Sequence, residues 1–283
     1  MIIKKSMKGS EGLAKREDLK YNFLKAVIVR IDFQGVFETE VDRIIPEIKP
    51  LLMEKGFTGY KTKRLDEIRI DILEKDAVEA KAEKKSNLMI HSFVNASGYT
   101  LDICKDFICL NLNSTSYVPF DEYGSLMMDV ANVYKEKIDF CSFKRIGIRK
   151  INICMAEDKK KISSFFSDKY FGYYDSVEGA ETLTSRRRDT FKIDPYKVNL
   201  ACNIDQGTAE KKKLYKVTLD IDIYLDDKRI LELPDFNSGI MKQMNDVLFD
   251  VFISTLTDDF ITALSGDDAH VFSDLIGVEP NEG

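Results

Sequence analysis

The chain has 283 residues, of which 44% are hydrophobic and 32% are charged, and its formal net charge is -6 at pH 7. This is the composition of a globular protein long enough to bury roughly 75% of its unfolded surface, as one large domain or two closely packed ones. The negative balance argues against a protein that coats DNA or RNA, because non-specific phosphate binding needs a dominant basic surface.

The sequence contains no segment that approaches the roughly 20 apolar residues of a membrane-spanning helix. Its first residues do not resemble a signal peptide, because Met1, Ile2 and Ile3 are followed at once by Lys4 and Lys5 rather than by an apolar run. We therefore expect a cytoplasmic protein without a membrane partner.

The five cysteines form no Cys-x-x-Cys pair, and their odd number indicates neither a zinc ribbon nor a disulfide framework. Most have Ile, Leu or Phe neighbours, which favours small buried hydrophobic residues. These cysteines are Cys104, Cys109, Cys141, Cys154 and Cys202.

The only histidines are His91 and His270, so a His-based metal site or a His-activated nucleophile has few residues to draw on. A Gly-rich phosphate loop, a Walker sequence, a nucleophile elbow and a His-Glu-x-x-His motif are all absent. We therefore predict no catalytic residue and no resident cofactor.

The N-terminal third begins with residues 1–20, which are polar and basic and are expected to form a flexible arm. The β-branched run at 23–33 predicts a strand, and the apolar spacing after Thr39 predicts a helix that Gly56 ends. Alternation at 67–72 predicts a strand before a charged, solvated stretch.

The middle of the chain predicts three short strands joined as antiparallel hairpins, at 88–96, 99–105 and 107–114. An amphipathic helix follows at 121–137, and then a strand at 144–155. In that strand the apolar positions change from even to odd numbers near Arg149 and Lys150, which indicates a β-bulge or burial on both faces.

After residue 157 the sequence is irregular and then returns to strands. An aromatic cluster from Phe165 to Tyr174 fits either a partner-binding surface or satellite core under a long connection. Alternating strands are expected up to 225, and the helix predicted at 237–264 is apolar on two sides, so it should be covered on two sides. Residues 265–283 form an acidic tail.

Two parts of the chain repeat one order of elements: a strand, a Pro-containing turn with a Phe, and a Met-rich helix. This predicts an α+β fold of two similar halves, each a curved, mainly antiparallel sheet with helices packed on one face. The halves would be sub-domains at 21–156 and 157–264, although chance similarity is a fair competing explanation.

The polar faces of several predicted strands have more charge than solvation requires. Carboxylates at i and i+2 of a strand share one face about 7 Å apart, and with opposing arginines they could bind a polyphosphate and its Mg²⁺. The alternative is a solvent-facing surface with cross-strand ion pairs that contribute little. The candidate ligand-binding residues are Arg69, Arg145, Arg149, Arg186, Arg188, Asp220 and Asp222.

The strand Arg145-Ile146-Gly147-Ile148-Arg149-Lys150-Ile151-Asn152 resembles the Arg-Ile-Gly-(Leu/Ile)-Arg-Tyr-(Ile/Val)-Asn strand of a sporadically distributed, uncharacterised family of bacterial and archaeal proteins. The order of the flanking strands and helices is similar over nearly the whole chain. Lys150 replaces the family's usual aromatic residue. The resemblance implies an accessory gene in phage defence or in a toxin-antitoxin pair, and no functional residue follows from it.

Three functions follow as hypotheses. The first is a non-catalytic binding or assembly protein with a protein partner or a second copy of itself. The second is a metal-dependent enzyme that binds polyphosphates or nucleotides through the charged strand faces. The third is nucleic-acid binding through a local basic patch that includes Arg186 and Arg188.

Overall fold

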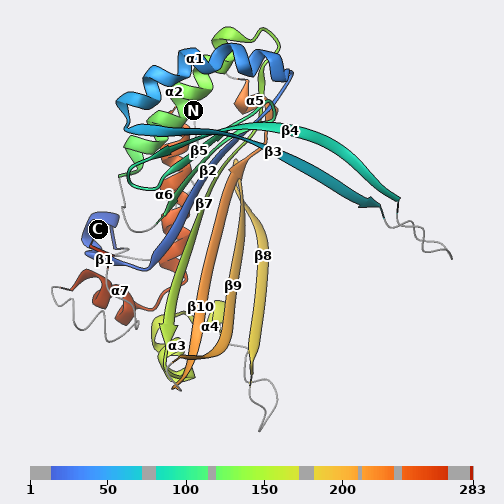
Figure 1. Ribbon diagram of the computed structural model, residues 1–283. Coiled ribbons are helices and arrows are strands. Elements are labelled where there is room, and N and C mark those ends of the chain that lie inside the picture. Colours follow the sequence, from blue (N-terminus) through green and yellow to red (C-terminus); the bar gives the residue numbers. More distant parts are fainter. Residues whose placement is uncertain are drawn as a thin grey trace.

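The computed structural model describes residues 14–71, 81–113, 119–171, 182–209, 212–232, 238–266 and 281–282. Within this part of the chain, one antiparallel sheet of nine strands has helices against one of its faces (Figure 1). The predicted basic arm, the charged stretch after residue 72 and the acidic tail lie largely outside the described residues.

The sheet has the strand order β3-β4-β5-β6-β2-β7-β10-β9-β8. Its strands are β2 (Leu24–Gln34), β3 (Phe57–Asp71), β4 (Lys81–Asn95), β5 (Thr100–Ile103), β6 (Phe107–Asn113), β7 (Ser142–Ala156), β8 (Thr184–Ile193), β9 (Tyr196–Ala209) and β10 (Lys212–Leu225). A separate two-stranded ladder joins β1 (Tyr21–Asn22) to β11 (Asn281–Glu282).

The expectation of two halves, each with a sheet of its own, is corrected to a single sheet. β7 pairs with β2 along one edge and with β10 along the other, so strands from both predicted sub-domains form one continuous ladder. Main-chain hydrogen bonding across this seam leaves no boundary between two sheets at residue 156. The α+β class and the antiparallel pairing are confirmed.

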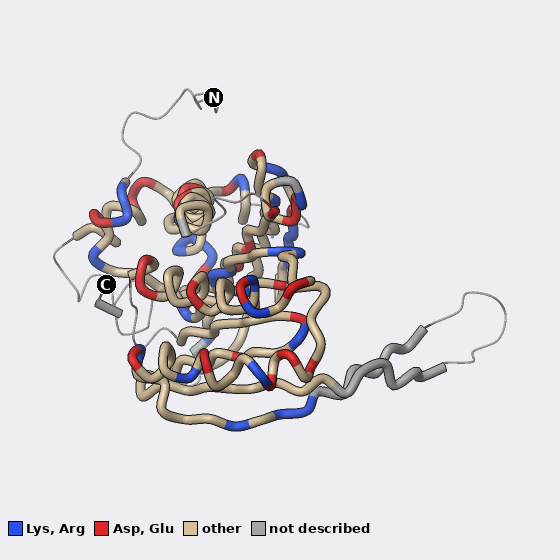
Figure 2. Tube along the Cα trace, turned by 90° about the horizontal axis from the view of Figure 1, so that it is seen from above, with Lys and Arg blue, Asp and Glu red and all other residues tan. Residues whose placement is uncertain are grey.

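Helices cover one side of the sheet. The three long ones are α1 (Glu38–Glu54), α2 (Phe120–Lys137) and α6 (Ser238–Ser254). Figure 2 shows the fold from above with its charged residues coloured. The shorter helices are η1 (Arg16–Asp18), α3 (Lys159–Phe165), α4 (Asp168–Phe171), α5 (Lys228–Leu231) and α7 (Asp258–Ser265).

The core lies between this helix layer and the sheet, because every second side chain of each central strand is apolar and points toward the helices. Val29 and Ile31 of β2, Ile148 of β7 and Leu219 and Ile221 of β10 are all fully buried there. The alternate positions of these strands remain half-exposed on the opposite side, which we call the open face.

The helix expected at 237–264 is two helices, α6 and α7. Thr257 starts the second one, because its side chain accepts a hydrogen bond from the backbone N–H of Phe260 at 3.2 Å. The break lets Phe252 and Phe260 both pack against Phe23, with ring centroids 5.5 Å away in each case.

The change of apolar phase in β7 is not a β-bulge. Its pairing with β2 runs without a shift from Ile146 to Ile151, and its pairing with β10 has no shift at all. Even-numbered residues continue to face the helices, and two of them are polar: Lys150, which is 8% exposed, and Asn152, which is 5% exposed.

Candidate functional site

The site is built around the strand with the most specific sequence motif, β7. Residues of β7 alternate between the two faces of the sheet. The side chains of Arg145 and Arg149 project from the open face, where Gly147 also lies. The side chains of Ile146 and Ile148 enter the core. Because residues paired across a ladder lie on the same face, the register of the neighbouring strands assigns their side chains to this face as well.

Arg149 and Asp220 of β10 form a two-pronged ion pair. Nε of Arg149 donates to Oδ1 of Asp220 at 2.8 Å and Nη2 donates to Oδ2 at 2.6 Å. This contact raises the pKa of the Arg149 guanidinium. Two parallel hydrogen bonds hold both side chains in one orientation.

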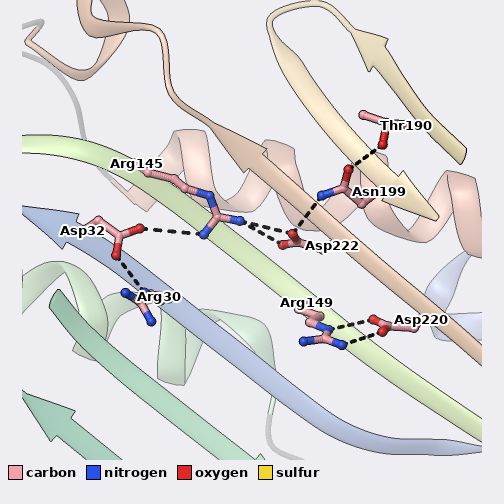
Figure 3. Close-up of polar contacts among 8 residues, drawn as sticks. All are labelled: Arg30, Asp32, Arg145, Arg149, Thr190, Asn199, Asp220 and Asp222. Atoms are coloured by element: carbon pink, nitrogen blue, oxygen red, sulfur yellow. Dashed lines mark hydrogen bonds and ion pairs between the residues drawn. The ribbon is translucent and has the colours of Figure 1, made fainter. Parts of the chain in front are cut away.

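Arg145 connects acids from two strands. Its Nη2 donates to both carboxylate oxygens of Asp222, at 3.1 and 3.3 Å, and its Nη1 lies 3.8 Å from Oδ2 of Asp32 on β2 (Figure 3). Nε of Arg30 donates to the other oxygen of Asp32 at 2.7 Å. Both acids are largely buried, with side chains 22% and 17% exposed.

The same network continues toward the sheet edge. Nδ2 of Asn199 on β9 donates to Asp222 at 3.2 Å, and the hydroxyl of Thr190 on β8 donates to Oδ1 of Asn199 at 2.9 Å (Figure 3). Polar contacts on the open face therefore connect the five adjacent strands β2, β7, β10, β9 and β8.

Gly147 makes room for the central arginine. A Cβ atom at this position would meet Nη1, Nη2 and Cζ of Arg145 at 3.0 to 3.2 Å. The guanidinium can therefore lie close to residue 147, and its Cζ is over the ring of Tyr224 at 4.6 Å from the ring centroid. A similar stack places Arg30 over the ring of Phe107 at 4.1 Å.

The remaining predicted residues are farther from this centre. Arg186 and Arg188 are exposed on the edge strand β8, on the same open face, and Nη2 of Arg186 donates to Asp205 at 2.5 Å. Arg188 forms no ion pair with a residue that the structure describes. Arg69 belongs to the outer part of β3, where its backbone pairs with Glu83 and its side chain is not described.

The open face is basic although the chain is acidic. Ten Lys and Arg side chains of the described strand positions share this face by register, against five Asp. The basic residues are Arg30, Lys61, Lys63, Arg145, Arg149, Arg186, Arg188, Lys192, Lys197 and Lys216. The acidic residues are Asp32, Asp102, Asp205, Asp220 and Asp222.

The predicted arrangement for a metal ion does not form at Asp220 and Asp222, because each carboxylate already accepts hydrogen bonds from an arginine. In the described part of the chain, no group of three His, Cys, Asp or Glu side chains is close enough to hold a metal ion. Six of the candidate residues share the open face of the sheet: Arg145, Arg149, Arg186, Arg188, Asp220 and Asp222. Of these six, only Arg186 also lines the pocket beside α4.

His91 makes contacts that hold the fold together. Its Nδ1 lies 2.9 Å from the Tyr60 hydroxyl oxygen and its Nε2 lies 3.1 Å from Oδ1 of Asp42, which joins β4 to α1. Burial lowers the pKa of His91 more than Asp42 raises it. His270 lies outside the described residues.

The cysteine prediction is confirmed for the three buried residues, Cys104, Cys154 and Cys202. Burial raises the pKa of Cys154 and of Cys202 to about 12, so both thiols remain protonated at neutral pH.

The described part of the aromatic cluster is largely core, and Tyr173 and Tyr174 lie outside the described residues. Phe165, Phe166 and Phe171 are buried, and Phe165 stacks on Phe260 with 4.4 Å between ring centroids. Beside Phe171, between α4 and the edge strands, lies a half-open pocket of about 450 Å³. Its lining residues are Tyr170, Phe171, Ser185, Arg186, Arg187, Cys202 and Ile204.

Arg30, Asp32 and Asn199 belong to the network but were not among the sequence candidates. The signal for the first two was present, because they occupy polar positions in the alternating strand at 23–33. Asn199 is uncharged, and only its position opposite Asp222 in the ladder reveals its role.

No helix in the described part of the chain is both long enough and apolar enough to cross a membrane.

No protein-family model and no curated protein matches the chain. Among solved structures, DynU16 from the dynemicin biosynthetic locus is 12% identical, with 85% of this chain and 97% of that chain covered and a TM-score of 0.17. The Schizosaccharomyces pombe RNA triphosphatase Pct1 is 5% identical, with 83% and 85% covered and a TM-score of 0.14. Similarities this low support no inference about function.

Proposed function

We propose that this protein is a non-catalytic binding protein that holds a single-stranded nucleic acid across the open face of its sheet. The supporting observation is the ratio of ten Lys and Arg to five Asp on this face, in a chain whose net charge is -6. A concentration of positive charge on one side allows phosphate binding that the overall charge would disfavour.

The five Asp side chains do not neutralise the positive charge of this surface evenly. Asp32, Asp220 and Asp222 are the least exposed charged groups of the central network, and their arginines are more exposed, at 46% for Arg149 and 29% for Arg145. Solvent and ligand thus meet mainly the cationic ends of these pairs.

The two stacked pairs favour nucleic acid over an acidic protein partner. Arg145 over Tyr224 and Arg30 over Phe107 present planar groups on the open face. Bases of a single strand stack on aromatic rings and on guanidinium planes, whereas an acidic peptide needs no such platform.

A polyphosphate-processing enzyme is the less supported alternative, because Asp220 and Asp222 are both bound to arginines and the basic face is too broad for a single small ligand. The family resemblance adds a setting to the proposal: a cytoplasmic accessory protein in phage defence or in a toxin-antitoxin pair.

The test is fluorescence anisotropy with a labelled 20-nucleotide single-stranded RNA. The variant Arg188→Glu/Lys216→Glu reverses two exposed charges that make no ion pair with a described residue. The control Lys160→Glu/Lys242→Glu makes the same change in net charge at exposed positions on helices α3 and α6, outside the strand positions of the open face. We expect the first variant to lose at least about tenfold in affinity and the control to bind like the wild type.

Equal losses in the two variants would contradict the proposal, because binding would then follow net charge and not this face. Absence of RNA and DNA binding at low salt would also overturn it. If poly-glutamate binds instead, the partner is an acidic protein.

A further inference from the structure

Two aromatic rings on the open face each lie under an arginine. Cζ of Arg30 is 4.1 Å from the ring centroid of Phe107, and Cζ of Arg145 is 4.6 Å from the ring centroid of Tyr224. All four residues are partly exposed. A ligand on the open face therefore meets both pairs.

The strand register places the two pairs in one row across the sheet. Phe107 of β6 pairs with Asp32 of β2, and Asp32 pairs with Arg145 of β7. Two residues further along β7, Gly147 pairs with Tyr224 of β10. Because paired residues lie side by side across a ladder, the row crosses four adjacent strands nearly at right angles to them.

Asp32 holds the two arginines in place relative to each other. One of its carboxylate oxygens accepts a hydrogen bond from Nε of Arg30 at 2.7 Å, and the other lies 3.8 Å from Nη1 of Arg145. The Asp32 side chain is 17% exposed, whereas that of Arg30 is 42% exposed and that of Arg145 is 29% exposed. The row thus presents two rings and two cations, with a less exposed acid between them.

Lysines continue the row toward the edge of the sheet. Lys197 of β9 pairs with Tyr224, and its Nζ is 5.8 Å from the centroid of that ring. Lys192 of β8 pairs with Lys197. Each lysine also contacts an acid, Asp226 at 2.7 Å from Lys197 and Asp194 at 2.6 Å from Lys192. A phosphate backbone that follows the row therefore passes cationic side chains on both sides of the Tyr224 ring.

The distance between the two rings limits which bases they can hold. Neighbouring strands lie about 4.8 Å apart and residues advance about 3.4 Å along a strand, so three strand intervals and a two-residue offset place Phe107 and Tyr224 roughly 16 Å apart at Cα. Stacked nucleotides advance about 3.4 Å each, so adjacent bases are too close together to reach both rings. A strand whose bases are splayed onto protein side chains is more extended, and the second base then follows the first by roughly two to four nucleotides.

We propose that the Arg30–Phe107 and Arg145–Tyr224 pairs are two base-stacking sites for one single strand of nucleic acid, which crosses the sheet at right angles to the β-strands. The inference rests on the proposed function, and it adds that two non-adjacent bases contribute to affinity beside the phosphates. A duplex does not fit these sites, because its bases are already stacked and paired.

The test uses labelled 10-nucleotide RNAs that have no base except at two positions. Two adenines are separated by zero to five abasic nucleotides, and fluorescence anisotropy at low salt gives the affinity of each RNA for the wild-type protein. Since only two bases are present, sliding of the RNA does not obscure their spacing. We expect the affinity to peak with one to three abasic nucleotides between the adenines, at least about fivefold above an RNA with one adenine.

Two variants assign the peak to the rings. Phe107→Leu and Tyr224→Leu each remove one ring but keep an apolar side chain, so each should reduce the peak to the affinity of the RNA with one adenine. Tyr60→Leu is the matched control, because Nζ of Lys49 lies 4.8 Å from the centroid of the Tyr60 ring, on the side of the sheet that faces α1. This control should keep the wild-type peak.

The spacing series needs only the wild-type protein, so it decides the question even if a variant does not fold. An affinity that does not change with spacing, or that peaks for adjacent adenines, overturns the inference. The proposed function stands in that case if RNA with all its bases still binds. Equal peaks in Phe107→Leu, Tyr224→Leu and Tyr60→Leu would also overturn the inference, because the bases then stack elsewhere. If no RNA binds, with or without bases, the proposed function fails together with it.

Discussion

Gly147 shows how one missing side chain positions a charge. Its neighbours in β7 have side chains, yet a Cβ here would press on the guanidinium of Arg145. Since the atom displaced is the end of a flexible side chain, Gly147→Ala should change the free energy of unfolding by no more than about 1 kcal/mol. It should nevertheless weaken RNA binding, because Arg145 leaves the ring of Tyr224.

The control is Gly207→Ala on β9, where the space around a new Cβ is open. Urea denaturation gives the stability of each variant and anisotropy gives its affinity. If Gly147→Ala and Gly207→Ala bind RNA equally well, then Arg145 needs no room at residue 147.

The two acids Asp222 and Asp205 should differ in their contribution to stability. Asp222 accepts hydrogen bonds from Arg145 and Asn199 at 22% exposure, so Asp222→Asn should cost about 1 to 2 kcal/mol, a range reduced for partial solvent screening. Asp205 is 36% exposed and pairs only at the edge, so Asp205→Asn should cost about 0.5 kcal/mol or less. The midpoints of urea denaturation compare the two variants. Equal losses of stability would contradict the claim that the network around Asp222 stabilises the fold.

Lys150 should make stability depend on pH. Its folded pKa, about 7, is below the unfolded value, so its contribution to stability is complete above the unfolded pKa and is lost as the pH falls toward 7. The free energy of unfolding should rise by about 1 to 2 kcal/mol from this group between pH 7 and 9. Lys150→Met should remove that rise, and an unchanged slope in the variant would show that Lys150 is not its source.

At the level of elements, sequence periodicity predicted most of the strands and the two long helices before residue 140. The single motif strand 145–152 also predicted that Arg145 and Arg149 share a face with each other. What periodicity could not show was which strands become neighbours, and it therefore missed the pairing of β2 with β7 that adds Arg30 and Asp32 to the network.

The phase change in β7 shows a limit of reading apolar residues alone. Lys150 and Asn152 look like outward positions by polarity, so the sequence pattern indicates either a β-bulge or burial on both faces. The ladder is regular, and the polar residues point inward. A buried lysine contradicts the pattern on which such predictions depend, and only tertiary contacts with α6 and η1 reveal it.

The contact between α1 and β4 through His91 should weaken in mild acid. Because burial lowers the folded pKa of His91 below 6.5, its contribution is present above pH 6.5 and is lost as the pH falls through the folded pKa. Hydrogen exchange of α1 amides should therefore accelerate between pH 7 and 5 beyond the intrinsic rate change. In His91→Leu this additional acceleration should be absent; its persistence would assign it to another group.

At the level of the whole molecule, one sheet replaces the two predicted halves. The repeated order of strand, turn and helix is visible in the sequence, but β7 is hydrogen-bonded to β2 and to β10 at once. Secondary structure and tyrosine fluorescence should therefore report one coincident urea transition. Two separated transitions would restore independent sub-domains at 21–156 and 157–264.

The two faces of strand β7 lie in different environments. Arg145 and Arg149 face solvent on the basic side, while Lys150 faces the helices. The candidate residues could be chosen from charge and spacing, but the excess of positive charge on one face emerged only from the register of all nine strands.

The most direct measurement of the central claim is photo-crosslinking of a 5-iodouridine single-stranded RNA to the wild-type protein, with crosslinked peptides identified by mass spectrometry. Crosslinks should fall on the open-face rows of β2, β7, β10 and β6, above all at Tyr224 and Phe107, which are the aromatic rings stacked with arginines there. Crosslinks confined to α1, α2 or α6 would contradict the assignment of the open face as the binding surface.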